Sequence, residues 1–221
     1  MEDSIKIEVQ EAIFDANDAI ALEINHKLTS KNIFGINVLG GPGVGKTSVL
    51  ISLIEKLAGR TSYVLEGDIE SDIDAQTLKA KGINTLQINT HGSCHLDAPI
   101  IESALESLEI NNDGILFIEN IGNLVCPAEF NIGEHIKLLI STVTEGSDKP
   151  YKYPLAFENA DIIIVNKVDL IPYVNFDTDF YMKGVKLLNK NAPVFFVSSK
   201  DSTGFEEVVE WIEKKIQSEF H

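Results

Sequence analysis

The run Gly40-Gly-Pro-Gly-Val-Gly-Lys-Thr47 has residue types and spacing that suit phosphate binding. It follows an apolar run and precedes an amphipathic stretch, which is the strand, loop and helix context that this motif requires. Glycines let the backbone turn its N–H groups toward phosphate, and the following helix adds a positive dipole. We expect Lys46 to reach the β- and γ-phosphates and Thr47 to bind Mg²⁺. The expected nucleotide contacts of this loop are Gly41, Gly43, Val44, Gly45, Lys46, Thr47 and Ser48.

A second short motif, Asn166-Lys-Val-Asp169, follows an apolar run where the carboxyl end of a strand can meet a nucleotide. A carboxylate at Asp169 can accept hydrogen bonds from guanine N1 and the exocyclic amine, whereas adenine has no matching pair of donors. The motif therefore predicts GTP rather than ATP. We expect base contacts from Asn166, Lys167 and Asp169, with Lys167 along the base plane. Further contacts are expected from Ser198, Ser199 and Lys200, with the Ser199 N–H donating to guanine O6.

Acidic residues at two further strand ends could serve hydrolysis. Glu119 ends the run Ile115 to Ile118, and Gly122 follows it where the backbone can approach the γ-phosphate. Asp68 is a second candidate for the metal or the attacking water, ahead of Asp74 and Glu70. The predicted catalytic set is Lys46, Asp68, Glu119 and Gly122, and the predicted magnesium set is Thr47, Asp68 and Glu119. Either acid alone could instead be a helix cap or a solvated charge.

Two cysteines and one histidine form a candidate metal site: Cys94, His95 and Cys126. Thiolate and imidazole ligands suit Zn²⁺ and also accommodate Ni²⁺. Three ligands leave a tetrahedral shell open, and symmetric pairing of two chains would bring six together. A free cysteine can equally be a small buried hydrophobe. A protease-like arrangement of Cys94, His95 and Asp97 is disfavoured because adjacent Cys and His side chains rarely face each other. The remaining histidines are expected on the surface: His26, His91, His135 and His221.

The elements that must position these groups alternate between strand and helix. Runs such as Ile162 to Val165 are apolar throughout, as expected when helices cover both faces of a parallel sheet. The sequence predicts a doubly wound, mostly parallel α/β fold of the P-loop NTPase type in residues 33–221, preceded by a helical extension in residues 1–32. That extension packs on its own domain or serves as a partner-binding arm. Strands are expected near 33–39, 62–67, 84–89, 114–119, 136–142, 161–166 and 194–198, and helices near 47–58, 71–81, 96–109, 176–190 and 204–218.

Composition narrows the classes of function. The chain has 221 residues, 44% of them hydrophobic, and a net charge of −16. So strong a negative charge argues against nucleic acid as a partner. No apolar run reaches the length of a membrane helix and the start lacks the basic residues of a signal peptide, which predicts a soluble, cytoplasmic protein without a membrane partner. Two cysteines are too few for a disulfide framework and suit a reducing compartment.

With these residues in view, the chain resembles the HypB family, the GTPase accessory proteins of nickel insertion into [NiFe] hydrogenase. The resemblance covers most of residues 33–217. It implies a SIMIBI-type GTPase that converts GTP to GDP with Mg²⁺. It also implies that Cys94, His95 and Cys126 bind nickel or zinc at a nucleotide-dependent homodimer interface. The implied partners are a HypA-type zinc protein and the hydrogenase large subunit. The matching segments are Gly-Gly-Pro-Gly-Val-Gly-Lys-Thr (40–47), Glu-Gly-Asp (66–68), Cys-His-Leu-Asp (94–97), Phe-Ile-Glu-Asn-Ile-Gly-Asn-Leu-Val-Cys-Pro-Ala (117–128), Thr-Glu-Gly (144–146), Lys-Pro-Tyr-Lys-Tyr-Pro (149–154) and Asn-Lys-Val-Asp (166–169).

Several points stay open at this stage. The Cys-rich and His-rich N-terminal stretches of some HypB proteins are absent from residues 1–32, so no strong nickel binding or storage is expected there. The basic segment from Lys149 to Lys152 either reaches a nucleotide across the dimer or is a solvated loop. No glutamine follows Gly122 to orient water, so slow intrinsic hydrolysis is expected. The alternatives are an accessory protein for urease or CO dehydrogenase, an ATP-using relative, and a GTP-assembled zinc scaffold.

Overall fold

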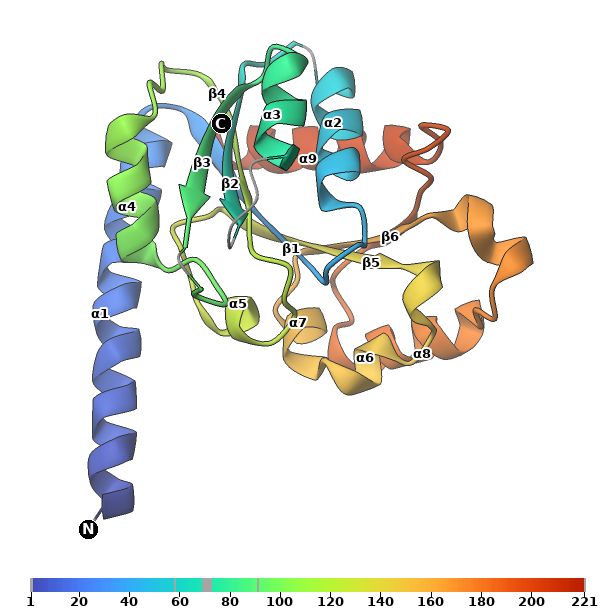
Figure 1. The fold of residues 1–221 in the computed structure, drawn as a ribbon, viewed down its shortest axis with the longest axis horizontal. Coiled ribbons are helices and arrows are strands. Elements are labelled where there is room, and N and C mark those ends of the chain that lie inside the picture. The colour runs from blue at the N-terminus through green and yellow to red at the C-terminus, as the bar shows by residue number, and fades with distance from the viewer. Residues whose placement is uncertain (1, 58, 69–72, 91, 221) are drawn as a thin grey trace.

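The chain folds around a seven-stranded sheet in which every strand pair is parallel. A computed structural model describes residues 2–57, 59–68, 73–90 and 92–220, with side chains from residue 14 onward. The spatial order is β3-β2-β4-β1-β5-β6-β7 (Figure 1). The predicted doubly wound parallel fold is therefore confirmed. The strands are β1 (Ile33–Gly40), β2 (Ser62–Asp68), β3 (Asn84–Asn89), β4 (Gly114–Glu119), β5 (Ile136–Thr142), β6 (Ile162–Asn166) and β7 (Val194–Phe196).

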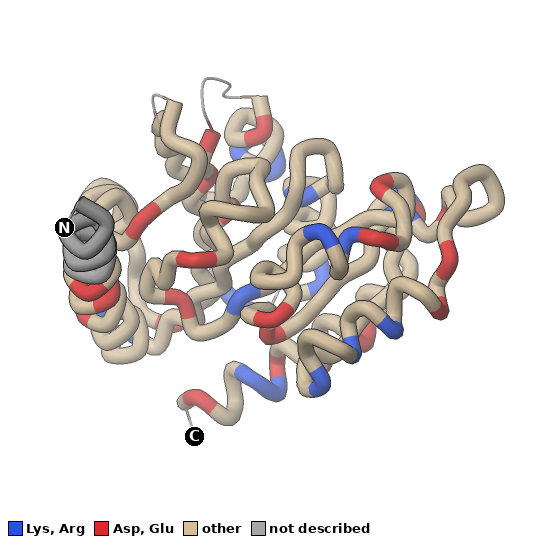
Figure 2. The backbone as a smooth tube through the Cα atoms, turned by 90° about the horizontal axis from the view of Figure 1, so that it is seen from below, with Lys and Arg blue, Asp and Glu red and all other residues tan. Residues whose placement is uncertain are grey.

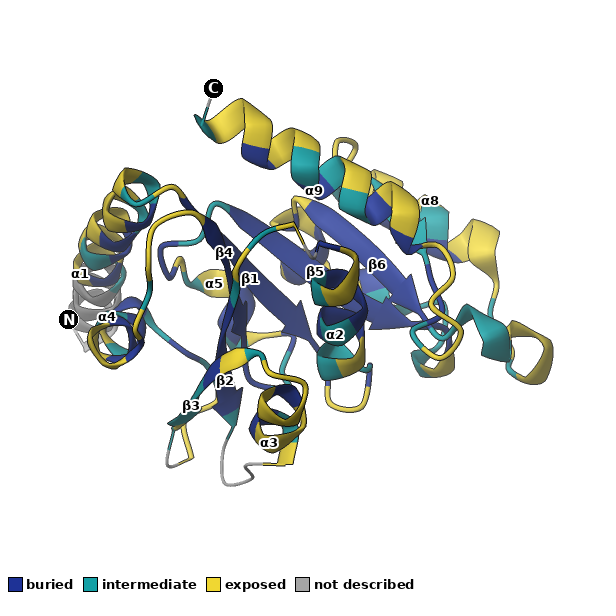
Figure 3. Ribbon diagram, turned by 90° about the horizontal axis from the view of Figure 1, so that it is seen from above, coloured by how far each residue is buried: buried dark blue, intermediate teal, exposed yellow. Residues whose placement is uncertain are grey.

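Continuous apolar strands are explained by burial on both faces of the sheet. In β1, Phe34, Ile36 and Val38 point into one core, whereas Ile33 and Leu39 point to the opposite side. The other central strands alternate in the same way, because successive side chains of a strand point to opposite faces. Figure 3 shows the central strands as buried along their length. Each face must therefore be covered by helices.

The helices form two layers. On one face, α2 (Lys46–Lys56), α3 (Ile73–Ala80) and α9 (Phe205–Phe220) contribute to one core. On the other face, α1 (Glu2–Ser30) and α4 (Ala98–Ser107) cover β2 and β4. The part of that face over β5 and β6 is covered by α5 (Cys126–Glu129), α7 (Pro154–Glu158) and α8 (Thr178–Leu188), with α6 (Lys149–Lys152) beside α8; short 3₁₀ helices span Val143–Glu145 and Val168–Tyr173.

The N-terminal extension is a single helix, α1, that runs alongside α4 (Figure 1). From residue 14 onward it packs on its own chain: Ala21, Ile24 and Leu28 are buried in the core that contains β2, β4 and α4. The boundary at residue 32 stays a prediction, since α1 shares a core with the residues that follow it.

One segment differs from the sequence predictions. The segment 126–158 contains the short helices α5, α6 and α7, and the basic segment Lys149–Lys152, for which a solvated loop was one alternative, is the helix α6. Each of these helices is four or five residues long, too short for helical periodicity to show.

Among the described residues no helix is long and apolar enough to cross a membrane. Acidic residues are spread over many elements, with basic residues interspersed (Figure 2).

Candidate nucleotide and metal sites

The phosphate-binding loop connects β1 to α2 at the carboxyl edge of the sheet. Gly43 and Gly45 have φ values of 74° and 91°, which glycine adopts without strain. A side chain at Gly40 would lie 2.9 Å from the carbonyl oxygen of Ile140, so this position also requires glycine. The first residue of α2 is Lys46, and no side chain caps its N-terminus. Its free N–H groups therefore face the loop, as phosphate binding requires.

Lys46, Thr47 and Glu119 meet at the base of this loop. The Thr47 hydroxyl donates to Glu119 Oε1 at 3.1 Å, and Lys46 Nζ lies 4.0 Å from the same oxygen. Glu119 is buried, and burial raises its pKa to about 7 despite the opposing effects of Lys46 and Thr47. A hydroxyl and a carboxylate beside the phosphate loop are oxygen ligands of the kind that Mg²⁺ prefers. The two residues therefore fit a magnesium ion.

Three more carboxylates line the same cleft, whose volume is about 290 Å³. The carboxylate oxygens of Glu66, Asp68 and Asp74 lie within 4.8 Å of one another. Burial raises the pKa of Glu66 to about 8, and repulsion by Glu119 and Asp68 adds to this shift. Asp68 and Asp74 thus both lie where sequence reasoning sought a metal or water ligand, whereas Glu70 lies outside the described residues. Sequence reasoning gave Glu66 no role, although it quoted Glu66 in a strand and in the segment Glu-Gly-Asp (66–68). Glu66 precedes Asp68 by two residues and so shares its face.

The guanine-recognition motif is joined to the phosphate loop by side-chain hydrogen bonds. Asn166 donates to the carbonyl of Val44 at 3.0 Å, and its Oδ1 accepts from the Ser199 N–H at 3.1 Å. Asp169 accepts from the Ser198 hydroxyl at 2.9 Å. Lys167 was expected along the base plane and Ser199 as a donor to guanine O6. These base contacts stay predictions. In the structure Lys167 Nζ donates to the carbonyl of Gly43 at 2.6 Å, Ser199 donates to Asn166, and Lys200 is exposed.

The segment from Glu119 to Cys126, which we call the switch segment, lies against the phosphate loop. Gly122 approaches Pro42 so closely that a side chain would be 3.2 Å from its Cα. Next to it, Asn123 forms an antiparallel bridge with Gly40. The N–H of Leu96 donates to Asn120 Oδ1 at 3.1 Å, and Asn123 Nδ2 donates to the carbonyl of Cys94 at 3.3 Å. These two asparagines, which sequence reasoning did not single out, connect the switch segment to residues 94–96.

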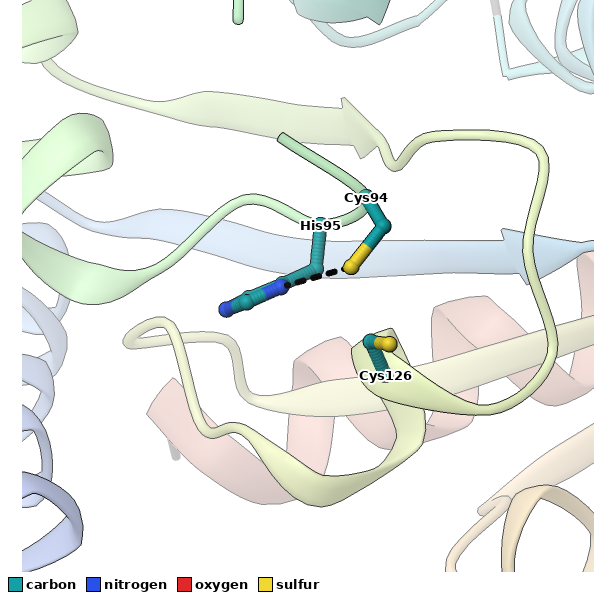
Figure 4. A group of neighbouring side chains, drawn as sticks. All are labelled: Cys94, His95 and Cys126. Carbon is teal, nitrogen blue, oxygen red and sulfur yellow. Dashed lines mark hydrogen bonds between the residues drawn. The ribbon is translucent and has the colours of Figure 1, made fainter. Parts of the chain in front are cut away.

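Cys94, His95 and Cys126 converge, with their ligand atoms within 4.8 Å of one another (Figure 4). Cys94 is exposed and Cys126 half-buried, so neither is the buried hydrophobe that was the alternative. A hydrogen bond with Cys126 raises the pKa of the Cys94 thiol, and burial adds to the shift. Two thiols and an imidazole at this separation fit Zn²⁺ or Ni²⁺.

The expectation that adjacent Cys and His side chains do not face each other is wrong here, because Cys94 Sγ lies 3.6 Å from His95 Nδ1. The third member of the protease alternative is engaged elsewhere. The Asp97 carboxylate accepts from the Ile100 N–H and caps α4. A helix-capping carboxylate is fixed by the backbone, so it does not orient an imidazole.

The other histidines divide into three cases. His26 is exposed as predicted, and His91 and His221 lie outside the described residues. The surface prediction for His135 is wrong. Its Nδ1 accepts from the Gly35 N–H at 2.8 Å, its ring stacks on Phe34, and burial lowers its pKa. His135 therefore joins β1 to the start of β5.

The basic segment is a short helix rather than a loop, and its contact with a nucleotide across a dimer stays a prediction. Lys149 and Lys152 lie in α6, where Lys149 Nζ pairs with Glu145 at 3.1 Å and Lys152 pairs with Asp148. Glu145 in turn lies close to the phosphate loop, because a Cβ atom on Gly41 would be 3.0 Å from Glu145 Oε1. Lys149 is therefore held near the phosphate loop of its own chain.

This fold and site can be compared with known proteins. The family model of the CobW/HypB/UreG nucleotide-binding domain matches residues 35–196. The chain is 40% identical to the hydrogenase maturation factor HypB of Azotobacter chroococcum over 95% of this chain and 69% of that relative. It is 38% identical to the hydrogenase/urease maturation factor HypB of Helicobacter hepaticus over 95% of this chain and 88% of that relative.

Solved structures agree with the sequence comparisons. The crystal structure of HypB from Helicobacter pylori in complex with nickel is 33% identical, with a TM-score of 0.88, and the match covers 93% of this chain and 97% of that one. HypB from Archaeoglobus fulgidus gives a TM-score of 0.83 at 31% identity, with 91% and 99% of the two chains covered. With its parallel sheet, its phosphate loop and these similarities, the chain belongs to the HypB family of nucleotide-binding hydrogenase maturation factors.

Proposed function

We propose that this protein is a GTP-hydrolysing nickel metallochaperone that assists nickel insertion during [NiFe] hydrogenase maturation. Curated relatives that cover most of this chain are named hydrogenase maturation factors, and the HypB of Helicobacter pylori was crystallised with nickel. The cargo ion binds at Cys94, His95 and Cys126, whose soft ligands suit nickel and zinc alike.

The observation that carries this proposal is the position of the switch segment. Gly122 and Asn123 contact the phosphate loop, Asn123 contacts the backbone of Cys94, and Cys126 lies three residues further on. A rearrangement of this segment on binding or loss of the γ-phosphate would move a thiol ligand relative to Cys94 and His95. The nucleotide then changes the affinity for metal, and the metal must change the affinity for nucleotide by the same factor.

The residues divide the hydrolytic work as follows. Lys46 and the N-terminus of α2 hold the β- and γ-phosphates. Thr47 and Glu119 hold Mg²⁺, which neutralises charge on the phosphates when bound. Asp68 orients the attacking water, and Asp169 selects guanine. Because no glutamine follows Gly122, we expect turnover well below the enzyme median of about ten per second.

Assembly completes the proposal. One chain supplies three soft ligands, so a closed metal site needs a further donor, which a second copy provides in a nucleotide- and metal-dependent homodimer. Delivery then involves a HypA-type zinc protein and the hydrogenase large subunit, as family membership suggests. Lys149, which lies near the phosphate loop of its own chain, is the candidate for contact with a nucleotide in the partner.

Calorimetry tests the coupling directly. Nickel is titrated into the full chain with GDP, with a non-hydrolysable GTP analogue and without nucleotide, and the analogue is titrated with and without nickel. We expect nickel affinities that differ about 5- to 150-fold between the two nucleotide forms, with the reciprocal factor for the nucleotide. Equal nickel affinities in both forms would exclude the switch.

Urease is a second candidate acceptor, because the relative from Helicobacter hepaticus is named a hydrogenase/urease maturation factor. Nickel-loaded protein is mixed with apo-hydrogenase large subunit or apo-urease in the presence of GTP, GDP or no nucleotide. Transfer to hydrogenase that depends on GTP supports the proposal, and transfer to urease alone supports the second candidate. Transfer that proceeds equally with GDP indicates a GTP-assembled metal-binding scaffold without nucleotide-driven delivery.

A further inference from the structure

The candidate metal ligand His95 is in contact with two aromatic rings in series. Its imidazole stacks on Phe130, with ring centroids 4.3 Å apart and an interplanar angle of 20°. Phe130 in turn packs on Phe14 of α1, with centroids 5.0 Å apart. The orientation of the imidazole is therefore linked to the N-terminal helix, which carries none of the three candidate ligands.

A second contact joins the same turn of α1 to both segments that carry metal ligands. Asn17 is 5% exposed. Its Oδ1 accepts from the Ala98 N–H at 2.9 Å, and its Nδ2 donates to the carbonyl of Asn131 at 2.8 Å. Ala98 lies three residues after His95, and Asn131 lies five residues after Cys126. One buried side chain of α1 thus holds the two segments at a fixed separation.

The contact continues over the next two turns of α1. A side chain at Gly133 would lie 2.3 Å from Ile24 Cγ2, so this loop packs directly on the helix. Asn25 Nδ2 donates to the carbonyl of Glu134 at 3.2 Å. The loop that carries Phe130 is therefore held along α1 from Phe14 to Asn25.

From these contacts we propose that α1 is a positioning element of the metal site. Phe14 acts through Phe130 and His95, and Asn17 acts through its bonds to Ala98 and Asn131, to set metal affinity. The inference rests on the proposed function, in which Cys94, His95 and Cys126 bind metal. His95 is only half-buried, and a ring free to rotate would lose conformational entropy on binding a metal. Stacking on Phe130 fixes the ring before the metal arrives, as partners of metal ligands commonly do.

The test compares nickel and zinc affinities of the full-length protein, measured by competition with a chromophoric chelator. We expect Phe14→Leu to weaken nickel binding about tenfold, in the range found for groups that orient metal ligands. Phe14→Tyr keeps the ring and should restore most of the affinity. The matched control is Leu22→Ala on the same helix, because Leu22 is 57% exposed and should leave the affinity unchanged.

A double-mutant cycle separates positioning from general destabilisation. In a His95→Ala background, Phe14→Leu should have no further effect on nickel affinity, because the ring through which Phe14 acts is gone. The nickel–thiolate absorption band of Phe14→Leu should shift from that of the wild type, and the affinity for a fluorescent GDP analogue should not change. A tenfold loss that persists in the His95→Ala background overturns the inference.

The outcomes also distinguish this inference from the proposed function. If the wild type binds no nickel or zinc, the proposed function fails and this inference fails with it. If the wild type binds and Phe14→Leu binds equally well, only the role of α1 is wrong. Asn17→Ala provides an independent variant, since it removes both bonds to Ala98 and Asn131 and should also weaken binding.

Discussion

The phosphate-binding loop and the Cys/His site lie at the same edge of the sheet but are built differently. The loop is one continuous segment whose glycines, Lys46 and Thr47 follow directly from β1, and Asn166 and Lys167 bond to its backbone. The Cys/His site instead takes ligands from two segments about 30 residues apart, and one of its thiols is exposed.

This difference bears on how each site holds its ligand. The phosphate loop is positioned by a central strand and by bonds to its own backbone, so its geometry belongs to the core of the fold. The candidate metal ligands and the residues next to them are instead contacted by Asn120, Asn123, Phe130 and α1. Under the proposed function, a site of this second kind would change affinity when its supports move, which suits a cargo ion that must be released.

The largest expected effect concerns Lys46. Because its ammonium is proposed to bind the phosphates, Lys46→Ala should lower the GTP hydrolysis rate by about 10²- to 10³-fold, as loss of one preorganised charge typically does. Nickel affinity without nucleotide should stay at the wild-type value if the two sites are separable. Phosphate release and chelator competition measure the two quantities.

Lys56→Ala is the matched control for Lys46→Ala. Lys56 lies at the other end of the same helix and pairs with Glu206 on the surface. Its removal should leave hydrolysis within twofold or so of the wild type, because exposed ion pairs contribute little. Hydrolysis by Lys46→Ala at the rate of Lys56→Ala would remove Lys46 from the proposed mechanism.

The next prediction perturbs the Cys/His site, at Cys126, and leaves the phosphate loop intact. A hydroxyl is a poor substitute for a thiolate as a metal ligand, so Cys126→Ser should weaken nickel binding by about 100-fold or more. This loss is larger than that caused by replacing a residue that only orients a ligand. GDP affinity without metal should not change. Val125→Ala serves as the control, since Val125 is 53% exposed and adjacent in sequence. If Cys126→Ser retains nickel and dimerises like the wild type in every nucleotide form, the proposed coupling between the metal ion and the nucleotide is wrong.

The sequence predicts the phosphate loop, the seven strands and the fold class because these depend on local patterns. An apolar run such as Ile162 to Val165 indicates a buried strand, and the glycines of residues 40–45 indicate a tightly turned loop. The convergence of Cys94, His95 and Cys126 followed from residue type and loop position, and the resemblance to one family pointed to the same three residues.

What the sequence did not predict depends on contacts between distant segments. His135 was expected on the surface, yet its partners Phe34 and Gly35 lie about 100 residues earlier in the chain. Glu66 lies next to Glu119 because β2 pairs with β4, a register that neither strand reveals alone. The contact of Phe130 with Phe14 likewise joins α1 to a loop more than 100 residues away.

The smallest expected effect is a dependence of stability on pH that arises at the phosphate end. In the folded chain burial raises the pKa of Glu66 to about 8 and that of Glu119 to about 7, from an ordinary value of 4.5. The folded state therefore holds protons that the unfolded chain releases between these values. This contribution to stability is fully present below about pH 4.5 and is lost as the pH rises toward 8.

Without nucleotide or magnesium, the melting temperature should fall by a few degrees between about pH 5.5 and about pH 8.5. Glu66→Gln should flatten the slope, because an amide has no proton to release, whereas removal of the exposed Glu210 should leave it unchanged. Magnesium should also flatten it, since a cation in the cleft favours ionised carboxylates. If the melting temperature of Glu66→Gln falls with pH as steeply as that of the wild type, the buried carboxylates of the phosphate end do not control this dependence. The two sites then differ in how they are positioned and not in the charge that they bury.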